Sequence, residues 1–551
     1  MKIAIVSMEV KSGRCEENYT YMKEMIERAK QEQADMICFP MNAISGYAVG
    51  DMWKESAWCR YVDHFNQLLV DMSEDIAIVW GNIKYRGNHV FNAAFFAYQK
   101  ETHMRVRKND EASMFAEDSN FTSLDIQSAI SFQDEVFALN FGKEVQVADW
   151  NINIDAKPFD IHETHTVKGN VIYVNAVGMQ NRNKAVVVMA GGSYIAKQSK
   201  LCYQMEIGKA GYALLDTEKL TPCDTKKADI CEVLACGIRG FDEQVLGGRA
   251  PWIVGLSGGL DSSVSAALLV YALGKERVIG YSMASKHNSD KTKNNARQVA
   301  DALGIPCKEG SIERVVDATK EVLSAYGYHD VEGLPLENIQ ARLRGHLLSS
   351  FAALEGGVVV NNGNKVENAL GYCTLYGDAI GALGILGDVT KVQLFDVAKQ
   401  LQQKFGKEVV PNNLLPQVID EKIIWEVAPA AELKDGQVDP MKWFYHDYLV
   451  DHLGRDMHVE DILRAYIDGC LLASSIGPYM RFYGLDDPQA FLQDLDWFLY
   501  TAKRNQFKHL QVPAIISITS NSYAFRKEVQ GNFDQAYLKA LRMQIMNMKK
   551  Q

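Results

Sequence analysis

The segment SGGLDSS, residues 257–263, carries residues that could hold phosphate groups. It follows an apolar stretch, 252–255, that predicts a buried strand, and it precedes apolar spacing over 264–273 that predicts a helix. Its glycines let the backbone approach a ligand, while its serines and free amides point into the positive end of that helix. The segment lacks the lysine of the GxxxxGK[ST] loop and instead offers Asp261, a carboxylate suited to a metal ion. We therefore expect an anion cradle, with an ordinary turn whose serines cap the helix as the alternative.

A second charged segment is ENIQARLRG, residues 337–345. Its spacing predicts an amphipathic helix with Gln340 and Arg344 near one face and Arg342 across from it. Because a guanidinium group can bind phosphate through two parallel hydrogen bonds, these arginines could clamp a phosphate. The alternative is a solvated helix of mixed charge.

A third segment, residues 358–391, places several charges after a predicted buried strand, 358–360, and a turn rich in Gly and Asn. The charged residues are Lys365, Glu367, Asp378, Asp388 and Lys391. Carboxylates near a phosphate-binding loop are the oxygen ligands that Mg²⁺ prefers, and lysines can neutralise the charge that develops on leaving pyrophosphate. Taken singly, such charges are usually surface residues.

The elements that must position these segments fall into two domains, which we place at residues 1–225 and 226–551, because 551 residues are too many for one core. The first domain shows a helical pattern at 16–31 and more strands than helices, with strands expected at 136–139, 145–148, 170–175 and 184–189. This excess of strands predicts two sheets packed face to face with helices outside. After a charged linker and a helix expected at 230–245, alternating strands and helices predict a doubly wound parallel sheet that binds ligands at the carboxyl ends of its strands.

The composition argues against two classes of protein, general nucleic-acid-binding proteins and membrane-spanning proteins. The formal charge of −11 argues against general nucleic-acid binding, and no run of about 18 apolar residues is present to span a bilayer. The N-terminal residues lack the apolar core of a signal peptide, and the ten cysteines form no CxxC pair, which suits reduced thiols. We expect a cytoplasmic protein that has neither a nucleic-acid partner nor a membrane partner.

Several motifs together resemble known families. SGGLDSS resembles the PP-loop of the N-type ATP pyrophosphatases, and ENIQAR, GNK with Glu two residues later, GYCTLYGD and AAEL follow in the order of the NAD⁺ synthetase family. In the first domain, CFPMNAISGY, IDAKPF, and VIYVNAVGMQN followed by AGGSYI are similar to nitrilase-type amidases. The resemblance implies an α/β protein with a nitrilase-like α/β/β/α sandwich followed by a doubly wound PP-loop domain. This is the arrangement of the two-domain, glutamine-dependent type of synthetase.

The resemblance also implies a reaction and its ligands. ATP would adenylate the nicotinate carboxylate of deamido-NAD⁺, and ammonia would displace AMP. Asp261, Lys391 and Lys365 would support catalysis, and Asp261 and Glu367 would hold Mg²⁺. Deamido-NAD⁺ would contact Asn338, Arg342 and Asp378. The ATP site would comprise Gly255, Ser257, Gly258, Gly259, Asp261, Ser262, Ser263, Asn362 and Lys391.

The sequence departs from these families at several positions. Asn362 replaces a Thr and Ala430 a hydroxyl residue, both at positions that touch ATP in the family. In the first domain Met41 stands where nitrilase-type amidases have a Glu base, Ala148 stands near the expected Cys nucleophile, and only Lys108 could match the family's lysine.

We therefore expect no glutaminase activity, with ammonia taken from solution or from a separate protein. The alternatives are a non-catalytic nucleotide-binding or scaffold protein and another amide-forming PP-loop synthetase. The family also implies a homodimer or a larger homo-oligomer.

Overall fold

The computed structural model describes residues 1–107, 121–122, 129–163, 166–285, 290–419, 422–430, 439–525 and 535–548. It divides into two compact units, Met1–Val245 and Leu246–Gln551. The division lies later in the chain than the boundary expected near residue 225, because helix α3 (Ile230–Gln244) packs on strands of the first unit.

The first unit contains two six-stranded sheets. One has the order β14-β1-β2-β3-β4-β5, in which β1, β2 and β3 run parallel and the outer strands are antiparallel. Its strands are β1 (Lys2–Ser7), β2 (Met36–Cys38), β3 (Ala77–Arg86), β4 (His89–Tyr98), β5 (Glu101–Val106) and β14 (Gly211–Asp216).

The other sheet has the order β13-β12-β9-β8-β7-β6, again with a parallel centre, β7, β8 and β9. Its strands are β6 (Ala129–Phe132), β7 (Glu135–Phe141), β8 (Trp150–Asp155), β9 (Val171–Asn175), β12 (Tyr194–Lys197) and β13 (Lys200–Gln204). The two sheets face each other through β1 and β9, β3 and β8, and β4 and β7. This arrangement confirms the predicted sandwich.

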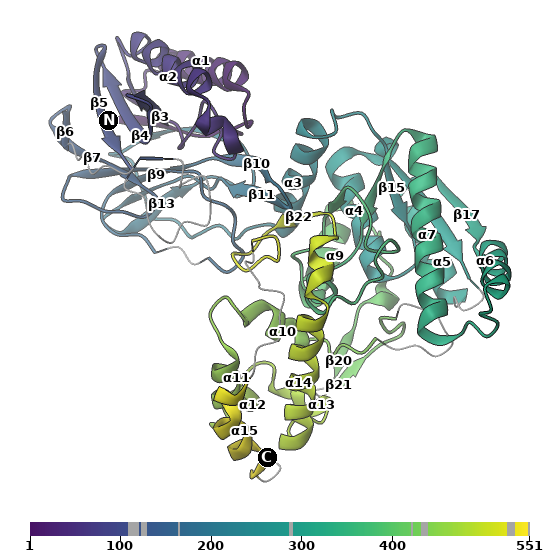
Figure 1. Cartoon of the computed structure of the whole chain (residues 1–551). Coiled ribbons are helices and arrows are strands. Elements are labelled where there is room, and N and C mark those ends of the chain that lie inside the picture. The colour runs from purple at the N-terminus through teal and green to yellow at the C-terminus, as the bar shows by residue number, and fades with distance from the viewer. Residues whose placement is uncertain are drawn as a thin grey trace. The chain divides into compact units, whose positions relative to one another are not determined.

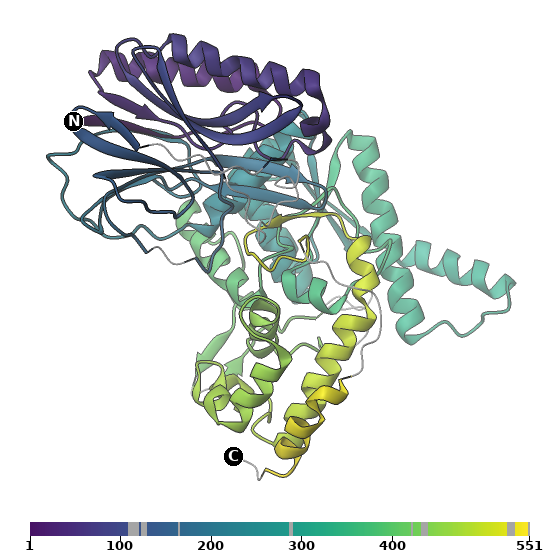
Figure 2. The same ribbon diagram turned by 60° about the vertical axis from the view of Figure 1, so that its left-hand side comes forward.

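Helices cover the parallel crossovers of the first sheet, and none covers those of the second sheet within the residues described. Helix α1 (Cys15–Gln31) joins β1 to β2, and α2 (Ser56–Asp71) joins β2 to β3; both lie along one face of the sheet in Figures 1 and 2. Between β7 and β8 the chain passes directly through residues 142–149, with no helix. Parallel strands usually need a longer connection, most often a helix.

The strand predicted at 145–148 is wrong, because these residues form the loop before β8. Val147 is fully exposed and Val145 is about half exposed, so the local alternation of valines with polar residues does not mark a buried strand. The predicted strand at 170–175 corresponds to β9, and the one at 184–189 corresponds to β11 (Ala185–Ala190). β11 pairs antiparallel with β10 (Val177–Arg182), and α3 packs on both.

The second unit contains a parallel sheet whose strands run in the order β22-β19-β18-β15-β16-β17. They are β15 (Trp252–Gly255), β16 (Val278–Ala284), β17 (Cys307–Ser311), β18 (Val358–Asn361), β19 (Leu383–Gly384) and β22 (Ala514–Ser517). The chain builds outward from β15 on one side and from β18 on the other. The order of strands therefore reverses between β15 and β18, which is where ligands bind in open α/β sheets.

Helices pack on this sheet as the predicted doubly wound fold requires (Figure 1). α4 (Leu260–Leu273) contacts β15 and β16, α5 (Asp290–Leu303) contacts β16, and α9 (Lys391–Phe405) contacts α4. α7 (Gly333–Glu355), which pairs with α6 (Glu313–Ala325), packs its Leu348, Phe351 and Ala352 on Ile253 and Val359. The fold class expected from sequence is confirmed.

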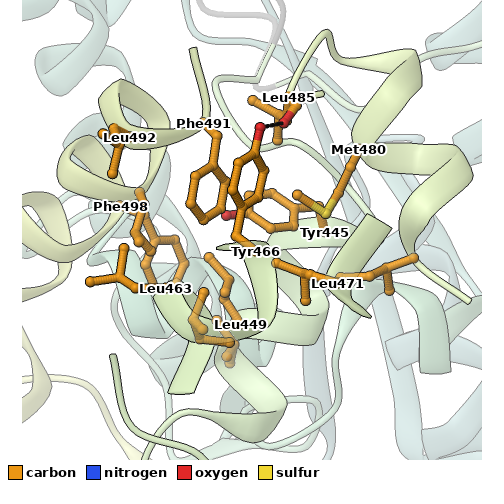
Figure 3. Close-up of a cluster of buried hydrophobic side chains, with 14 of the residues drawn as sticks. Tyr445, Leu449, Leu463, Tyr466, Leu471, Met480, Leu485, Phe491, Leu492 and Phe498 are labelled. Atoms are coloured by element: carbon orange, nitrogen blue, oxygen red, sulfur yellow. Dashed lines mark hydrogen bonds between the residues drawn. The ribbon is translucent and has the colours of Figure 1, made fainter. Parts of the chain in front are cut away.

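The C-terminal helices share a hydrophobic core with α8 (Lys365–Leu370) (Figure 3). They are α10 (Tyr445–His452), α11 (Val459–Ile467), α12 (Cys470–Ala473), α13 (Gly477–Phe482), α14 (Pro488–Arg504) and α15 (Lys539–Met546). At the centre the rings of Tyr466 and Phe491 stack, and the Tyr466 hydroxyl donates to the carbonyl of Leu485 at 3.0 Å. Within the described ranges no helix is long and apolar enough to cross a membrane.

Candidate active site

The candidate site lies where the strand order of the second unit reverses. β15 leads into SGGLDSS, and β18 leads into the turn at residues 362–364. The Asn362 side-chain amide donates to the carbonyl of Gly255 at 3.2 Å, which ties the two strand ends together. Two of the three segments singled out from sequence therefore meet at one edge of the sheet.

The SGGLDSS turn is held by its own serines. The Ser257 and Ser262 hydroxyls lie 3.1 Å apart, the Gly259 amide donates to the Ser257 hydroxyl at 3.2 Å, and the Ser263 hydroxyl donates to the Gly259 carbonyl at 2.7 Å. Gly258 has φ +83°, and a Cβ there would overlap the carbonyl oxygen of Thr292 in α5. The turn opens onto the N-terminus of α4, an arrangement able to bind an anion.

Asp261, in the first turn of α4, gathers two partners. It forms an ion pair with Lys391, and the Asn364 side-chain amide donates to its other oxygen at 2.9 Å. Lys391 begins α9 after a capping box at Thr390, is almost fully buried, and lies over the Trp443 ring at 5.1 Å. Burial alone would lower the pKa of Lys391, but the carboxylates of Asp261 and Glu367 outweigh burial and raise it.

Glu367 lies in α8 (Lys365–Leu370), where its carboxylate accepts from the Asn364 amide at 3.2 Å in a capping box. Burial and the negative charge of Asp261 raise the pKa of Glu367 well above its usual range, while Lys391 acts in the opposite direction. A third carboxylate, Asp439, also raises the pKa of Glu367 and accepts from the Tyr372 hydroxyl at 3.3 Å. Asp439 was not predicted from sequence, because it lies beyond AAEL in a stretch with no other signal.

The donors fit a divalent cation shared with phosphate. No cluster of three His, Cys, Asp or Glu residues that could hold a metal occurs in the part of the chain described. Mg²⁺ commonly uses only one or two protein carboxylates and takes its remaining ligands from substrate phosphates and water. Asp261 and Glu367 repel each other in partly buried positions, so a cation between them would offset that repulsion.

A second group forms between α7 and residues 374–378. The Thr374 hydroxyl donates to Asn338 at 2.8 Å, the Thr374 amide donates to Asp378 at 2.6 Å, and Arg342 donates to the Leu375 carbonyl at 3.3 Å. Thus Asn338 and Arg342, one turn apart on α7, contact the same short segment that contains Asp378. The Asn361 amide at the end of β18 donates to the Asp378 carbonyl at 2.8 Å, which links this group to the candidate site.

Lys365 does not join these residues. Its side chain is fully buried, and its Nζ lies 3.0 Å from Asp388, a residue also predicted from sequence. The expectation that Lys365 supports catalysis by neutralising pyrophosphate does not match this position, because its charge is already neutralised inside the protein.

The first unit contains the positions compared with a glutaminase. Met41 is buried after β2, its amide donates to the Asp155 carbonyl at 3.1 Å, and its sulfur accepts from the Asn92 amide at 3.6 Å. Ala148 precedes β8 and lies in no strand-to-helix turn, so the structure does not place it where a nucleophile of this type would sit. Lys108 lies outside the described residues.

Comparison with known proteins matches both units. The NAD synthase family matches residues 246–465, and the carbon-nitrogen hydrolase family matches residues 2–148. The two units therefore match the two parts of a two-domain NAD synthetase, an NAD synthase domain preceded by a carbon-nitrogen hydrolase domain. A glutamine-dependent NAD(+) synthetase of Synechocystis sp. is 26% identical over 509 residues, covering 82% of this chain and 88% of the relative.

Solved NAD synthetase structures share the fold. A glutamine-dependent NAD(+) synthetase from Cytophaga hutchinsonii superposes with a TM-score of 0.74 at 14% identity and covers 99% of both chains. The glutamine-dependent NAD+ synthetase from Acinetobacter baumannii, in complex with ADP, gives a TM-score of 0.67 at 22% identity, covering 95% of this chain and 97% of that one. At these identities the likeness is one of fold alone.

Proposed function

We propose that this protein amidates deamido-NAD⁺ to NAD⁺ at the expense of ATP. The observation that carries the proposal is the ion pair of Lys391 with Asp261, beside Glu367 and the SGGLDSS turn, at the point where the strand order reverses. This combines an anion cradle, two carboxylates and a buried cation in one place. The match of residues 246–465 to the NAD synthase family supports the same reaction.

The reaction would proceed in two displacements. A carboxylate oxygen of deamido-NAD⁺ attacks the α-phosphorus of ATP, and pyrophosphate leaves as the acyl adenylate forms. Ammonia then attacks the acyl carbon; the amide forms, AMP leaves, and one proton is released. Neither displacement needs a nucleophile from the protein, so positioning and charge neutralisation carry the rate.

Each residue has a definite task in this scheme. Ser257, Gly259 and Ser262 would hold the pyrophosphate portion of ATP, and Lys391 would neutralise the charge that develops on it. Asp261 and Glu367 would hold Mg²⁺, which supplies charge stabilisation to the phosphates when bound.

The second group of residues would bind the other substrate. Asn338, Arg342 and Asp378 would contact the dinucleotide where α7 meets residues 374–378. We also propose Mg²⁺-ATP as the form of nucleotide bound and a homodimer or larger homo-oligomer as the assembly.

We further propose that the nitrogen comes from free ammonia. Nitrilase-type glutamine hydrolysis needs a Glu base and a Cys nucleophile on a sharp strand-to-helix turn. Met41 cannot accept a proton, and between β7 and β8 residues 142–149 include neither a cysteine nor a helix. The Synechocystis relative is named as a glutamine-dependent enzyme, so this chain would differ from it in the source of nitrogen.

The experiment supplies purified full-length protein with Mg²⁺-ATP, deamido-NAD⁺ and either ammonium or glutamine, and measures NAD⁺, AMP and glutamate. NAD⁺ and AMP in equal amounts with ammonium, and neither NAD⁺ nor glutamate with glutamine, is the expected result. Glutamate formed in proportion to NAD⁺ would contradict the ammonia proposal. No NAD⁺ with either donor would favour a non-catalytic nucleotide-binding protein.

A further inference from the structure

Lys365 lies in a closed network of buried polar groups. Lys365 and Asp388 are both fully buried, and the Lys365 ammonium lies 3.0 Å from Asp388, 2.9 Å from the Thr519 hydroxyl and 2.9 Å from the Asn521 side-chain oxygen. Asp451 lies 3.5 Å away. An ammonium group has three protons, and these acceptors engage all of them. A phosphate would find no proton of Lys365 free to bind it.

Asp388 is equally committed to partners inside the protein. Its carboxylate accepts from the amide of Ile518 at 2.7 Å, and from the amide and hydroxyl of Thr519 at 2.8 and 2.9 Å. Asn521 in turn donates to the carbonyl of Asp451 at 2.9 Å. The network therefore joins α8, the segment before α9, the end of α10 and the residues after β22.

Both charged residues are close in sequence to groups of the candidate site. Lys365 directly follows Asn364, which donates to Asp261, and precedes Glu367 by two positions. Asp388 precedes Lys391 by three positions, and the Lys365 amide donates to the Val389 carbonyl at 2.9 Å. One ion pair and one backbone hydrogen bond thus clamp the two segments that present Asn364, Glu367 and Lys391.

We propose that the buried Lys365–Asp388 ion pair is a positioning device for the ATP site, and that Lys365 acts only through the residues it holds. It keeps the start of α8 and the start of α9 in register, so that Lys391 and Asn364 meet Asp261. The inference rests on the proposed function for its effect on turnover, whereas the clamp itself depends only on the contacts described.

The test compares three variants: Lys365→Met, Asp388→Asn and the double variant. Lys365→Met leaves a buried carboxylate without its cation, which is strongly destabilising, whereas neutralising both partners removes that penalty. We expect Lys365→Met to lower kcat for NAD⁺ formation with ammonium by about 100-fold, the scale of a small misplacement of reacting groups. We expect the double variant to recover at least about tenfold of that loss and to unfold at a higher temperature than Lys365→Met.

Whether activity recovers in the double variant decides between a positioning role of Lys365 and direct contact of its ammonium group with phosphate. If its ammonium touched phosphate, removing the Asp388 charge could not replace it, and the double variant would be no more active than Lys365→Met. That result would overturn the proposal. In Lys391→Met, whose cation faces the candidate site, adding Asp388→Asn should give no recovery. The exposed pair Lys399 and Asp396, 3.9 Å apart on α9, provides the matched control, and its Met and Asn variants should match wild type.

Two measurements keep this outcome distinct from failure of the proposed function. Thermal unfolding and equilibrium binding of Mg²⁺-ATP are read for every variant, whether or not NAD⁺ forms. Weaker nucleotide binding and a lower unfolding temperature in Lys365→Met, both partly restored in the double variant, support the clamp even if the reaction differs. Unchanged unfolding and binding in Lys365→Met would overturn the clamp even if wild type makes NAD⁺.

Discussion

At the scale of single residues, Gly258 is the most tightly constrained position of the anion cradle. Its φ of +83° disfavours any side chain, and a Cβ would also overlap the Thr292 carbonyl, so two independent penalties fall on one substitution. We expect Gly258→Ala to reduce ATP-dependent turnover by about 100-fold or more, because the turn must shift to relieve the overlap. Steady-state AMP formation measures it.

Gly247 provides the control for this prediction. It has a similar φ of +75° but no atom within 4 Å of an added Cβ. Gly247→Ala should therefore cost only backbone strain, about 1 kcal/mol, and leave turnover near wild type. Equal losses of turnover in the two variants would mean that strain alone, and not the contact with Thr292, decides the effect.

Asp261 carries the second prediction at this scale. Asp261→Asn keeps the shape of the side chain but removes the charge that pairs with buried Lys391 and that we assign to Mg²⁺. We expect the rate of pyrophosphate release with deamido-NAD⁺ present to fall by about 100- to 1,000-fold. Raising the Mg²⁺ concentration should restore part of the loss if the carboxylate binds the metal. Turnover near that of wild type would contradict the assignment of Asp261 to the active site.

Residue types alone predicted part of this site. Asp261 could be proposed because it lies within the candidate anion cradle, and Glu367 and Lys391 because they follow the Gly- and Asn-rich turn after a second buried strand. The structure brings the three together. Lys365 follows the same turn at a similar spacing, but its side chain is buried away from these residues. Its partners Thr519 and Asn521 lie 154 and 156 positions later in the sequence, so the local pattern could not reveal that Lys365 is buried.

At the scale of elements, the sequence correctly predicts the majority of the segments whose hydrophobic periodicity is strong. The helix expected at 16–31 is α1, and the strand and helix around SGGLDSS are β15 and α4. The strand expected at 145–148 fails because alternation of apolar and polar residues also occurs in an exposed loop. β8, which follows it, alternates asparagine and isoleucine with every residue of 150–154 buried, so its polar positions concealed it.

The contact between α10 and α14 gives a prediction about pH. His446 is buried; its Nδ1 accepts from the Lys442 amide at 3.0 Å, and its Nε2 lies 2.9 Å from Asp494. A second proton would have to displace the Lys442 amide. Burial lowers the pKa of His446 below 6.5, although Asp494 acts in the opposite direction. As the pH falls through about 6.5, His446 therefore becomes protonated in the unfolded chain while it stays neutral in the folded protein.

The free energy of unfolding should thus be constant with respect to His446 above pH 6.5 and fall as the pH is lowered below that value. Urea unfolding midpoints between pH 5.5 and 8 measure the slope. His446→Gln should flatten it, whereas His329→Gln, a substitution at an exposed histidine, should leave it unchanged. An equal slope in wild type and His446→Gln would assign the acid sensitivity to other groups.

At the scale of the whole molecule, two compact units of different fold occur in one chain, and only the second carries a candidate ATP site. The nitrilase-like sandwich has both sheets and their buried apolar faces, although Met41 stands at the position where we expected a Glu base. Apolar strands stabilise a sandwich whether or not catalytic residues remain at its edge. Fold and activity in the first unit can therefore be lost independently, and we expect the fold to have outlasted the activity.

The last prediction tests the proposal that the first unit has no cysteine nucleophile for glutamine hydrolysis. Cys38 is fully buried within β2 and Cys59 is buried in α2, and burial raises the pKa of both thiols. A thiol that stays protonated at neutral pH is a poor nucleophile. In the native full-length protein, iodoacetamide should therefore label the exposed Cys470 but neither Cys38 nor Cys59. Cys59→Ala should leave NAD⁺ formation from ammonium unchanged, and glutamine should support none in either protein. Rapid labelling of Cys59 together with glutamine-dependent glutamate release, both lost in Cys59→Ala, would instead identify that thiol as a relocated nucleophile.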